Sequence, residues 1–357
     1  MMVMKKKSII ILLVVLVLVV VIVLLLPKST KKTYAVDNLT LVETVKEKNK
    51  GSTYSAGASG VFYTNDHEYR YIGAEVDNYV LFNNDLYRII GVFDENSHGV
   101  SGKELVKVIR SRILGSFSYG AYNSSATSGT YSSYKNDWSG TTTGVVANTN
   151  VLFNQFFYNK TKEVTGYSNC TTWTYFSSNV NYRTNDCSDI VGYGIDDSVR
   201  GYIEEVTWYL KGYSSTSFNK QAFYTCERSE DTVITSCTSG NSGGYAKSTT
   251  GYIGLMYASD YLYASSNYAS SDTTNVGTGY HGNKNWLYKG YEWTITPDGD
   301  SATYAFRVNS SGLLSSDNTY FGSGVRPSFY LKSSVYVTGG SGTHSEPYTI
   351  ACDDCSL

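Results

Sequence analysis

Residues 79–93 read YVLFNNDLYRIIGVF. Two runs of aromatic, aliphatic and β-branched residues, 79–82 and 86–93, flank the polar triplet Asn83-Asn84-Asp85. Such runs favour strands, and short loops rich in Asn and Asp join antiparallel partners. The sequence therefore predicts a β-hairpin with a three-residue turn. Side chains of alternating character over residues 105–114 predict a third strand of the same meander.

The composition favours short strands and loops over long helices. The 357 residues include 34 Tyr and 33 Gly but only 4 Pro. Tyr and Thr favour strands, while Gly, Asn and Ser favour turns. Residues 116–146 show little periodicity and predict a long loop, and short strands should return after Gly251. We expect an α+β fold with small twisted antiparallel sheets, one or two helices and long loops.

Three segments carry a helical pattern. Residues 39–50 begin with Thr40 and Glu43, the spacing of a capping box, and end before Gly51. A short helix is expected at residues 151–158. The clearest periodicity predicts a helix over residues 198–211, where apolar side chains recur at Val199, Ile203, Val206 and Leu210.

The segment Ile9–Leu26 is an uninterrupted apolar run that follows three lysines. At the helical rise it spans about 27 Å, close to the hydrocarbon thickness of a bilayer. An uncleaved signal-anchor is the first interpretation, and cleavage after Thr33-Tyr34-Ala35 is the alternative. The predicted organisation is a cytoplasmic stub (1–8), a transmembrane signal-anchor (9–26), a stalk with a short helix (27–60) and an extracellular β-rich domain (61–357).

This arrangement places the protein in the cell membrane as a single-pass protein with its C-terminal domain outside. Beyond residue 32 the chain carries 29 − 6 = 23 basic and 31 acidic side chains, a net charge near −8. That balance argues against nucleic acid as a partner. The expected partners are the membrane, through the N-terminal helix, and an unidentified extracellular glycan or protein.

Six cysteines lie in the C-terminal part of the chain. An even number in an oxidising compartment indicates disulfides, although six cysteines permit many pairings. Proximity in the sequence favours Cys170–Cys187, Cys226–Cys237 and Cys352–Cys355. The last pair forms a CxxC motif, which could also serve redox chemistry or half a zinc site. A terminal disulfide is the favoured interpretation.

No catalytic or metal-binding motif is recognisable in the sequence. The four histidines, His67, His98, His281 and His344, lack the spacing of a metal-binding helix. The segment Asp298-Gly299-Asp300 could offer oxygens to calcium, but a Pro-Asp-Gly turn is the favoured interpretation. We therefore expect no enzyme activity, no cofactor and no bound metal.

Several blocks together resemble a family of uncharacterised extracellular domains of Gram-positive bacteria. They occur in order at residues 71–73, 78–83, 86–93, 254–261, 293–297, 324–332 and 347–350. That family resembles a variant of the C-type-lectin fold, as in formylglycine-generating enzymes. The resemblance implies a mixed fold with small sheets, few helices and many loops. It implies no activity, because the reactive cysteines and the calcium-binding triplets have no counterpart here.

Within those blocks, Arg326 is expected to cap carbonyls or pair with an Asp, and Trp286 and Trp293 to anchor the core. A contact surface is predicted from alternating tyrosines around an acid, comprising Tyr257, Asp260, Tyr261 and Tyr263. The leading hypothesis is a surface-anchored, non-catalytic binding or adhesion protein. The alternatives are an extracellular enzyme acting on glycans or peptides, and a structural component of the envelope or of a pilus-like assembly.

Overall fold

The structure is a computed structural model, and it describes residues 39–49, 57–64, 66–117, 119, 136–138, 150, 152–160, 192–213, 220–228, 247–266, 284–319 and 321–356. The predicted span Ile9–Leu26, most of the loop 116–146, and Cys170, Cys187 and Cys237 lie outside these ranges. Within them, no helix combines the length and hydropathy that a membrane crossing requires. The described residues belong to one unit that begins at Leu39, earlier than the predicted domain start at residue 61.

The hairpin at residues 79–93 forms with a tighter turn than predicted. Strands β3 (Tyr79–Phe82) and β4 (Asp85–Phe93) pair with Phe82 opposite Asp85, so the loop has two residues. Both of them, Asn83 and Asn84, have positive φ angles of 55° and 57°. This is the backbone of a type I′ turn, which matches the twist of paired strands. The three-residue turn was wrong because Asp85 already belongs to β4.

Strand β4 is the central strand of the larger, eight-stranded sheet. One of its edges pairs with β5 (Leu105–Arg110), which confirms the third strand of the meander. The other edge pairs first with β3 and then with β2 (Tyr69–Ile72). At this change of partner a Cβ on Gly91 would lie 2.2 Å from the Tyr69 carbonyl oxygen, so glycine is required.

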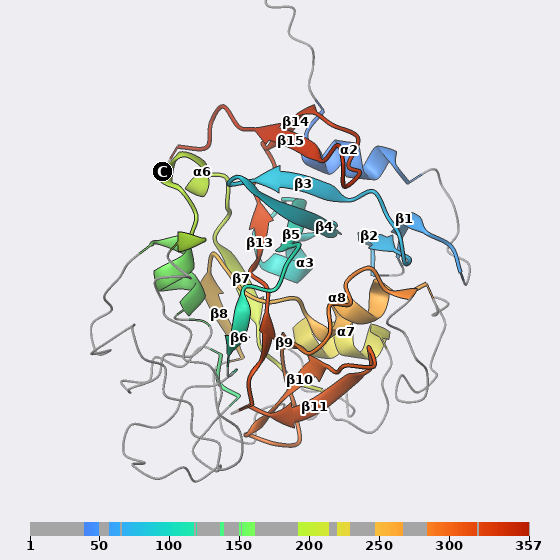
Figure 1. Cartoon of the computed structure of the whole chain (residues 1–357), viewed down its shortest axis with the longest axis vertical. Helices are drawn as coiled ribbons and strands as arrows, with labels where there is room; N and C mark the ends of the chain where they lie inside the picture. Colours follow the sequence, from blue (N-terminus) through green and yellow to red (C-terminus); the bar gives the residue numbers. More distant parts are fainter. Residues whose placement is uncertain are drawn as a thin grey trace, which may run out of the picture. The chain divides into compact units, whose positions relative to one another are not determined.

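Segments from both ends of the described chain extend this sheet (Figure 1). Strand β1 (Gly60–Tyr63) pairs with β2, and β13 (Ser328–Leu331) pairs with β5. Strand β15 (Tyr348–Ala351) lies parallel to β3 and antiparallel to β14 (Tyr336–Gly339). The larger sheet therefore joins residues that are more than two hundred positions apart.

Two smaller sheets complete the described fold. In the five-stranded sheet the order is β11 (Leu314–Asn318), β10 (Tyr304–Val308), β9 (Glu292–Pro297), β12 (Ser323–Val325) and β6 (Gly115–Phe117). Only β9 and β12 run parallel among these neighbours. Strands β7 (Val206–Tyr209) and β8 (Ser248–Gly251) form an antiparallel pair. The described residues thus form an α+β fold of small sheets.

Arg326 lies where the chain passes from β12 in one sheet to β13 in the other. Its side chain is fully buried, and Nε donates to Glu292 Oε1 at 2.7 Å. Nη2 donates to the Leu287 carbonyl at 2.6 Å. The structural role predicted for Arg326 is confirmed, although its acidic partner is a glutamate and not an aspartate.

The predicted N-terminal helix and its cap are confirmed. Helix α2 (Leu41–Glu47) begins where Glu43 N donates to Thr40 Oγ1 at 3.1 Å, and Thr40 N donates to Glu43 Oε2 at 2.8 Å. Leu41 and Val45 are buried in the same core as the sheets. The helix is therefore part of the folded domain and not of a separate stalk.

The other helices are short, and there are more of them than the one or two expected. The predicted helical segment near residue 151 is a π-helix, η2 (Leu152–Tyr158). The remaining described α-helices are α3 (Glu95–His98), α6 (Asp197–Arg200), α7 (Lys220–Arg228) and α8 (Ala258–Tyr263).

The helix predicted over residues 198–211 was wrong. Helix α6 ends at Arg200, and the next residues run into strand β7, where Val206, Trp208 and Leu210 are buried and the residues between them are half-buried. This alternation has the period of a strand. The β-branched and aromatic residues of the segment favour that state. Glycine is also required at position 201, directly after α6, because a Cβ there would lie 2.2 Å from the Cys355 carbonyl oxygen.

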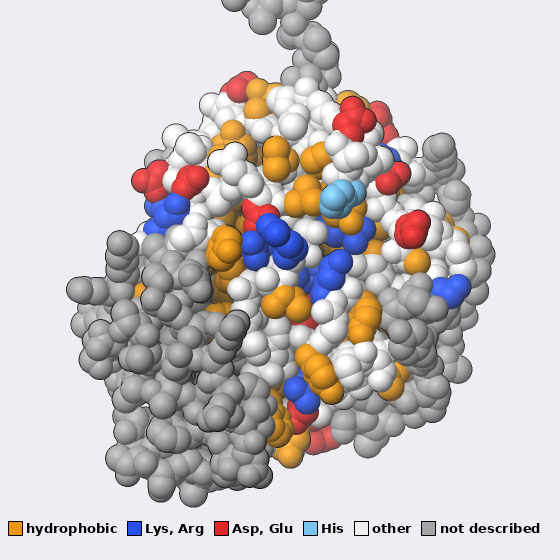
Figure 2. All heavy atoms as spheres, in the orientation of Figure 1, with side chains coloured by type: hydrophobic (Ala, Val, Ile, Leu, Met, Phe, Trp, Pro, Cys, Tyr) orange, Lys and Arg blue, Asp and Glu red, His pale blue; other side chains and the backbone are white. Residues whose placement is uncertain are grey.

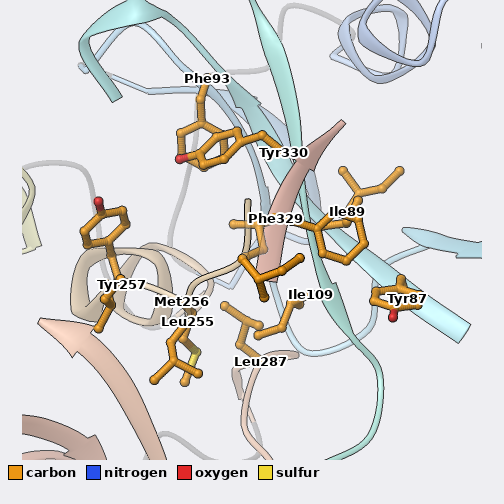
Figure 3. Close-up of a cluster of buried hydrophobic side chains, with 14 of the residues drawn as sticks. Tyr87, Ile89, Phe93, Ile109, Leu255, Met256, Tyr257, Leu287, Phe329 and Tyr330 are labelled. Carbon is orange, nitrogen blue, oxygen red and sulfur yellow. The ribbon is translucent and has the colours of Figure 1, made fainter. Parts of the chain in front are cut away.

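The core fills the space between the two larger sheets. Figure 3 shows side chains from β4, β5 and β13 meeting residues that precede and begin α8. Trp286 and Trp293 are buried, and each indole N–H donates to a carbonyl, of Tyr71 at 2.7 Å and of Phe117 at 3.0 Å. Their predicted role as core anchors is confirmed.

Candidate functional site

The residues predicted to form a contact face lie in the interior: Tyr257, Asp260, Tyr261 and Tyr263. Their exposed fractions are 0, 1, 1 and 5%. They lie on and just before α8, not on a strand, so the expected alternation does not occur. Asp260 Oδ2 accepts the Tyr257 N–H at 2.9 Å and so stabilises the start of this helix. The prediction of an exposed tyrosine face was therefore wrong.

Asp260 belongs to a set of six buried charged side chains, here called the buried ionic cluster. Its members are Glu68, Arg70, Lys107, Glu227, Arg228 and Asp260. Lys107 Nζ lies 2.6 Å from one Asp260 oxygen, and Arg70 Nη1 lies 3.0 Å from the other. Arg70 Nη2 also contacts Glu68 at 2.5 Å. The cluster joins β2, β5, α7 and α8 at the centre of the domain.

Burial and opposite charges act against each other in this cluster. Burial raises the pKa of Asp260, but Lys107 and Arg70 outweigh it and lower that pKa to about 2. Burial also lowers the pKa of Lys107 to about 8, despite the nearby carboxylate. For Glu68 and Glu227, burial wins and raises the pKa. Desolvation penalises each charged form; the partners outweigh this penalty at Asp260 and compensate for it only in part at Lys107, Glu68 and Glu227.

The other end of the cluster is held by hydroxyl groups. Glu227 Oε1 accepts from Thr296 Oγ1 at 2.5 Å, and Arg228 Nε donates to Ser97 Oγ at 2.9 Å. The Arg228 guanidinium lies between the rings of Tyr224 and Tyr257, at 4.1 and 4.4 Å from their centroids. Most polar atoms of the cluster are paired with one another, which is the pattern of a structural network, although Arg228 Nη2 and Arg70 Nε have no hydrogen-bond partner among the described residues.

A groove of about 820 Å³ lies at the five-stranded sheet and is here called the β6–β12 groove. It is lined by Ile113, Leu114, Gly115, Ser116, Tyr291, Arg307, Phe321, Gly322, Ser323 and Gly324. Tyr291 is 48% exposed, so its ring is available to a ligand. Two backbone hydrogen bonds join the segments around the groove. Leu114 N donates to Val325 O, and Gly324 N donates to Tyr291 O, each at 2.9 Å.

Arg307 of β10 supplies the charged group of the groove. Its guanidinium carbon lies 4.9 Å from the Tyr291 ring centroid and 5.6 Å from that of Phe321. Nη1 donates to Ser323 Oγ at 3.0 Å, and Nη2 contacts Asp317 on β11. Nε has no hydrogen-bond partner among the described residues. Arg307 therefore brings a positive charge into an aromatic surrounding, while its unpaired Nε is shielded from solvent.

Glycines bring the backbone to the surface of the groove. A Cβ on Gly324 would lie 2.7 Å from the Tyr291 carbonyl oxygen and 2.8 Å from Ile113 Cδ1. Gly115 and Gly322 line the same site. Glycine at position 324 thus lets β12 pack closely against residues 113 and 291, while the flanking rings line the groove.

A second, more open cavity of about 600 Å³ lies beside the buried ionic cluster. Its lining is mostly polar: Glu95, Asn96, Gly99, Ser101, Tyr209, Tyr224, Thr225 and Arg228. Arg228 connects this cavity to the cluster. Glu95 is its single carboxylate among the described residues and accepts the Gly102 N–H at 2.6 Å.

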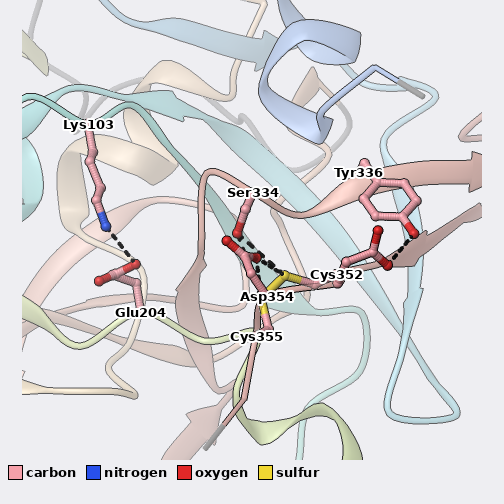
Figure 4. Close-up of a disulfide and its surroundings, with 8 residues drawn as sticks. Lys103, Glu204, Ser334, Tyr336, Cys352, Asp354 and Cys355 are labelled. Carbon is pink, nitrogen blue, oxygen red and sulfur yellow. Dashed lines mark hydrogen bonds and ion pairs between the residues drawn. A yellow bond between two sulfur atoms is a disulfide. The ribbon is translucent and has the colours of Figure 1, made fainter. Parts of the chain in front are cut away.

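The predicted disulfide between Cys352 and Cys355 is present near the C-terminus (Figure 4). Together with Asp354, these residues form a group whose donor atoms lie within 4.8 Å of one another. Both sulfur atoms are joined in the disulfide, so neither is available to a metal in this state. Cys226 is buried and disulfide-bonded, while its expected partner Cys237 lies outside the described residues, as do Cys170 and Cys187.

The segment considered for calcium is a turn, as favoured. Asp298 Oδ1 accepts the Asp300 N–H at 2.9 Å, and Oδ2 accepts the Ser316 hydroxyl. Both oxygens serve the turn and its neighbouring strand, which is the role of an Asp in an Asx-turn.

Few features of the sequence indicated either the buried ionic cluster or the groove. Lys107 is the one local signal, because it interrupts an apolar strand whose six residues are all buried. A lysine there requires a buried acid, but the sequence does not say which one. The groove comes from four separate segments, so no motif could have identified Tyr291 or Arg307.

Comparison with family models, with curated proteins and with solved structures finds no match for this chain.

Proposed function

We propose that this chain is a membrane-anchored extracellular protein that binds a glycan in the β6–β12 groove without chemical turnover. The observation that carries the proposal is the lining of the groove, where the exposed Tyr291 ring lies beside the Arg307 guanidinium over a glycine and serine surface. Aromatic faces contact the C–H groups of sugars, and hydroxyl and guanidinium groups bond to sugar oxygens. This combination suits a polar ligand with apolar faces.

A glycan fits this groove better than a protein partner does. Stable protein interfaces bury about 1,200–2,000 Å² and have a dry, apolar centre. The groove is instead concave, and its rings alternate with Ser116, Ser323 and Arg307. A sugar chain that enters it would meet both kinds of group along its length.

Two inferences from the sequence support the extracellular setting. The apolar run Ile9–Leu26 behind three lysines favours an anchor, and the ordered blocks resemble a C-type-lectin-like variant. Hydrolysis of a glycan would need two carboxylates about 5–10 Å apart. Among the described residues, no carboxylate lines the groove and one lines the second cavity. Binding without turnover is therefore the simpler proposal.

The test uses the full-length chain in detergent on an array of bacterial and mucosal glycans, followed by measurement of Kd for each glycan retained. Tyr291→Ala should weaken binding about tenfold through loss of the ring contact. Tyr63→Ala is the matched control, because Tyr63 and Tyr291 are both 48% exposed and Tyr63 lies outside the groove. Equal losses in the two variants, or no glycan retained by the wild type, would overturn the proposal.

A further inference from the structure

We infer that the β6–β12 groove takes an acidic glycan, one whose sugars carry carboxylate groups, and that Arg307 and Lys289 hold those carboxylates. The inference rests on the proposed function and adds the chemical class of the ligand. It follows from the charges in and around the groove.

Among the described residues, the lining of the groove contains one charged side chain, Arg307, and no acid. Its counterion, Asp317, lies on β11 and engages only Nη2. Nη1 is satisfied by Ser323, while Nε has no partner among the described residues. Nε is shielded from solvent, so a carboxylate in the groove would be attracted by the positive charge of the guanidinium as a whole.

Two further cations flank the groove in the chain. Arg112 immediately precedes Ile113, and its side chain is 77% exposed, with Asp85 at 3.5 Å. Lys289 is exposed and lies two residues before Tyr291, separated from it by Gly290. Lysine and arginine side chains gather near the centre of the face in Figure 2, with hydrophobic side chains next to them.

Among the described residues, Glu292 is the acid that acts on Lys289. Partial burial disfavours its charged form, and Arg326 and Arg88 repel it, so that its pKa lies below the usual range. Glu292 acts in the opposite sense, but that acid is fully buried and already bonded to Arg326 at 2.7 Å. A carboxylate bound beside Lys289 would relieve this repulsion. The charge pattern is therefore complementary to an anion.

This local excess of positive charge contrasts with the chain as a whole. Outside its first 32 residues the chain has 23 basic and 31 acidic side chains, from 29 − 6 and 31. A cationic groove on an acidic protein is not explained by composition. It would attract acidic polysaccharide while the rest of the surface repels it.

The experiment pairs acidic glycans with their uncharged forms. Full-length protein is titrated with polygalacturonate, alginate and hyaluronan, each also as its methyl ester. At least one acidic form should bind at least about tenfold more tightly than its ester, because each lost charge-assisted hydrogen bond weakens binding by that order. That binding should weaken as salt concentration rises.

Substitutions test which basic side chains interact with the carboxylates of the glycan. Lys289→Gln and Arg307→Gln should each reduce the preference for the acid over its ester, whereas Lys247→Gln, at an exposed lysine that directly precedes β8 of the two-stranded sheet, should not. Lys289 is a surface residue, so its variant tests the inference even if Arg307→Gln folds poorly. Equal binding of acid and ester, or binding of neutral glycans only, overturns the inference and leaves the proposed function standing. Retention of no glycan in the array overturns the proposed function itself.

Discussion

Lys107 in β5 and Asp260 in α8 form an ion pair of 2.6 Å at the centre of the domain, with neither side chain exposed to solvent. The two residues are 153 positions apart in the chain. Arg70 contacts the second carboxylate oxygen of Asp260. One buried carboxylate thus connects the larger sheet with α8. Such a pair fixes how these elements meet.

Asp260→Asn should strongly destabilise the fold. The substitution leaves Lys107 and Arg70 buried without their shared acid, which costs about 3–5 kcal/mol of unfolding free energy. Denaturation with urea measures the loss. Glu104→Gln breaks the exposed pair of Lys46 and Glu104, whose N···O distance is 2.7 Å, and should have no measurable effect. Similar stability for both variants would contradict a structural role for the cluster.

Tyr261→Ala should also destabilise the fold, by about 3–5 kcal/mol, because it removes a large buried ring. Tyr261→Phe should cost less, since it removes only the hydrogen bond from Oη to the Gly312 carbonyl at 2.7 Å. Thermal unfolding followed by near-UV circular dichroism measures both changes. A fully stable Tyr261→Ala variant that had lost binding to a surface would instead restore the contact face predicted from the sequence.

Local patterns predicted the elements whose stabilising contacts are close in the chain. The hairpin of β3 and β4 and the capped helix α2 follow from residues that are neighbours in sequence. Segment 198–211 failed because Val206 and Leu210 fit a helical period, while Val206, Trp208 and Leu210 fit a strand period. Pairing of β7 with β8, about 40 residues away, decided between them.

Whether Tyr257, Tyr261 and Tyr263 are buried or exposed depends on contacts with distant segments of the chain, which no local sequence pattern contains. Tyrosine and aspartate, the residues at positions 257 and 260, are typical of solvent-exposed surfaces. Their burial comes from Lys107, Arg70 and Arg228, which reach them from three other elements. For the same reason the groove could not be predicted, because residues 113–116, 291, 307 and 321–324 meet only in the folded domain.

The cysteines are predicted to pair as Cys170–Cys187 and Cys226–Cys237. Cys226 is disulfide-bonded and buried in α7, so its loss as Cys226→Ser should cost about 2–4 kcal/mol of stability in addition to its packing. Mass spectrometry of an unreduced digest identifies the pairs. Peptides that join Cys226 to Cys170 or Cys187 would contradict this connectivity, and free thiols at Cys170 and Cys187 would remove the first pair.

Membrane retention with the domain outside is the next prediction. The apolar run Ile9–Leu26 follows three lysines, and short positively charged N-terminal segments usually stay in the cytoplasm. Protease added to intact cells should release a fragment that begins after this segment. A mature N-terminus at Val36 in the culture medium would show instead that the segment is a cleaved signal. Protection of the whole domain in intact cells, with digestion after lysis, would reverse the orientation.

His98 should make the fold sensitive to mild acid. Its ring is fully buried beside Tyr330, Nδ1 accepts the Val100 N–H at 3.1 Å, and the proton on Nε2 faces the Phe93 carbonyl at 3.2 Å. This arrangement holds the neutral imidazole. Burial outweighs the Phe93 hydrogen bond and nearby acids and lowers the pKa of His98 from 6.5 to about 4.

The sign of the effect follows from proton binding. Between pH 6.5 and about 4 the unfolded chain takes up a proton on His98 that the folded chain does not. The contribution of His98 to stability is therefore fully present above pH 6.5, and it falls as the pH decreases from 6.5 to about 4. The loss between about pH 7.5 and about pH 5 should be about 2 kcal/mol. Glu68 and Glu227, whose pKa values burial raises, act in the opposite sense.

The variant His98→Gln separates these contributions. Gln can still accept from Val100 and donate to Phe93 but does not titrate, so its stability should change less between the two pH values than that of the wild type. Urea denaturation at each pH gives the two differences. The comparison cancels the glutamates, which both proteins share. If wild type and His98→Gln lose the same stability on acidification, the imidazole is already free to protonate in the folded domain, and its burial has no energetic consequence in this range.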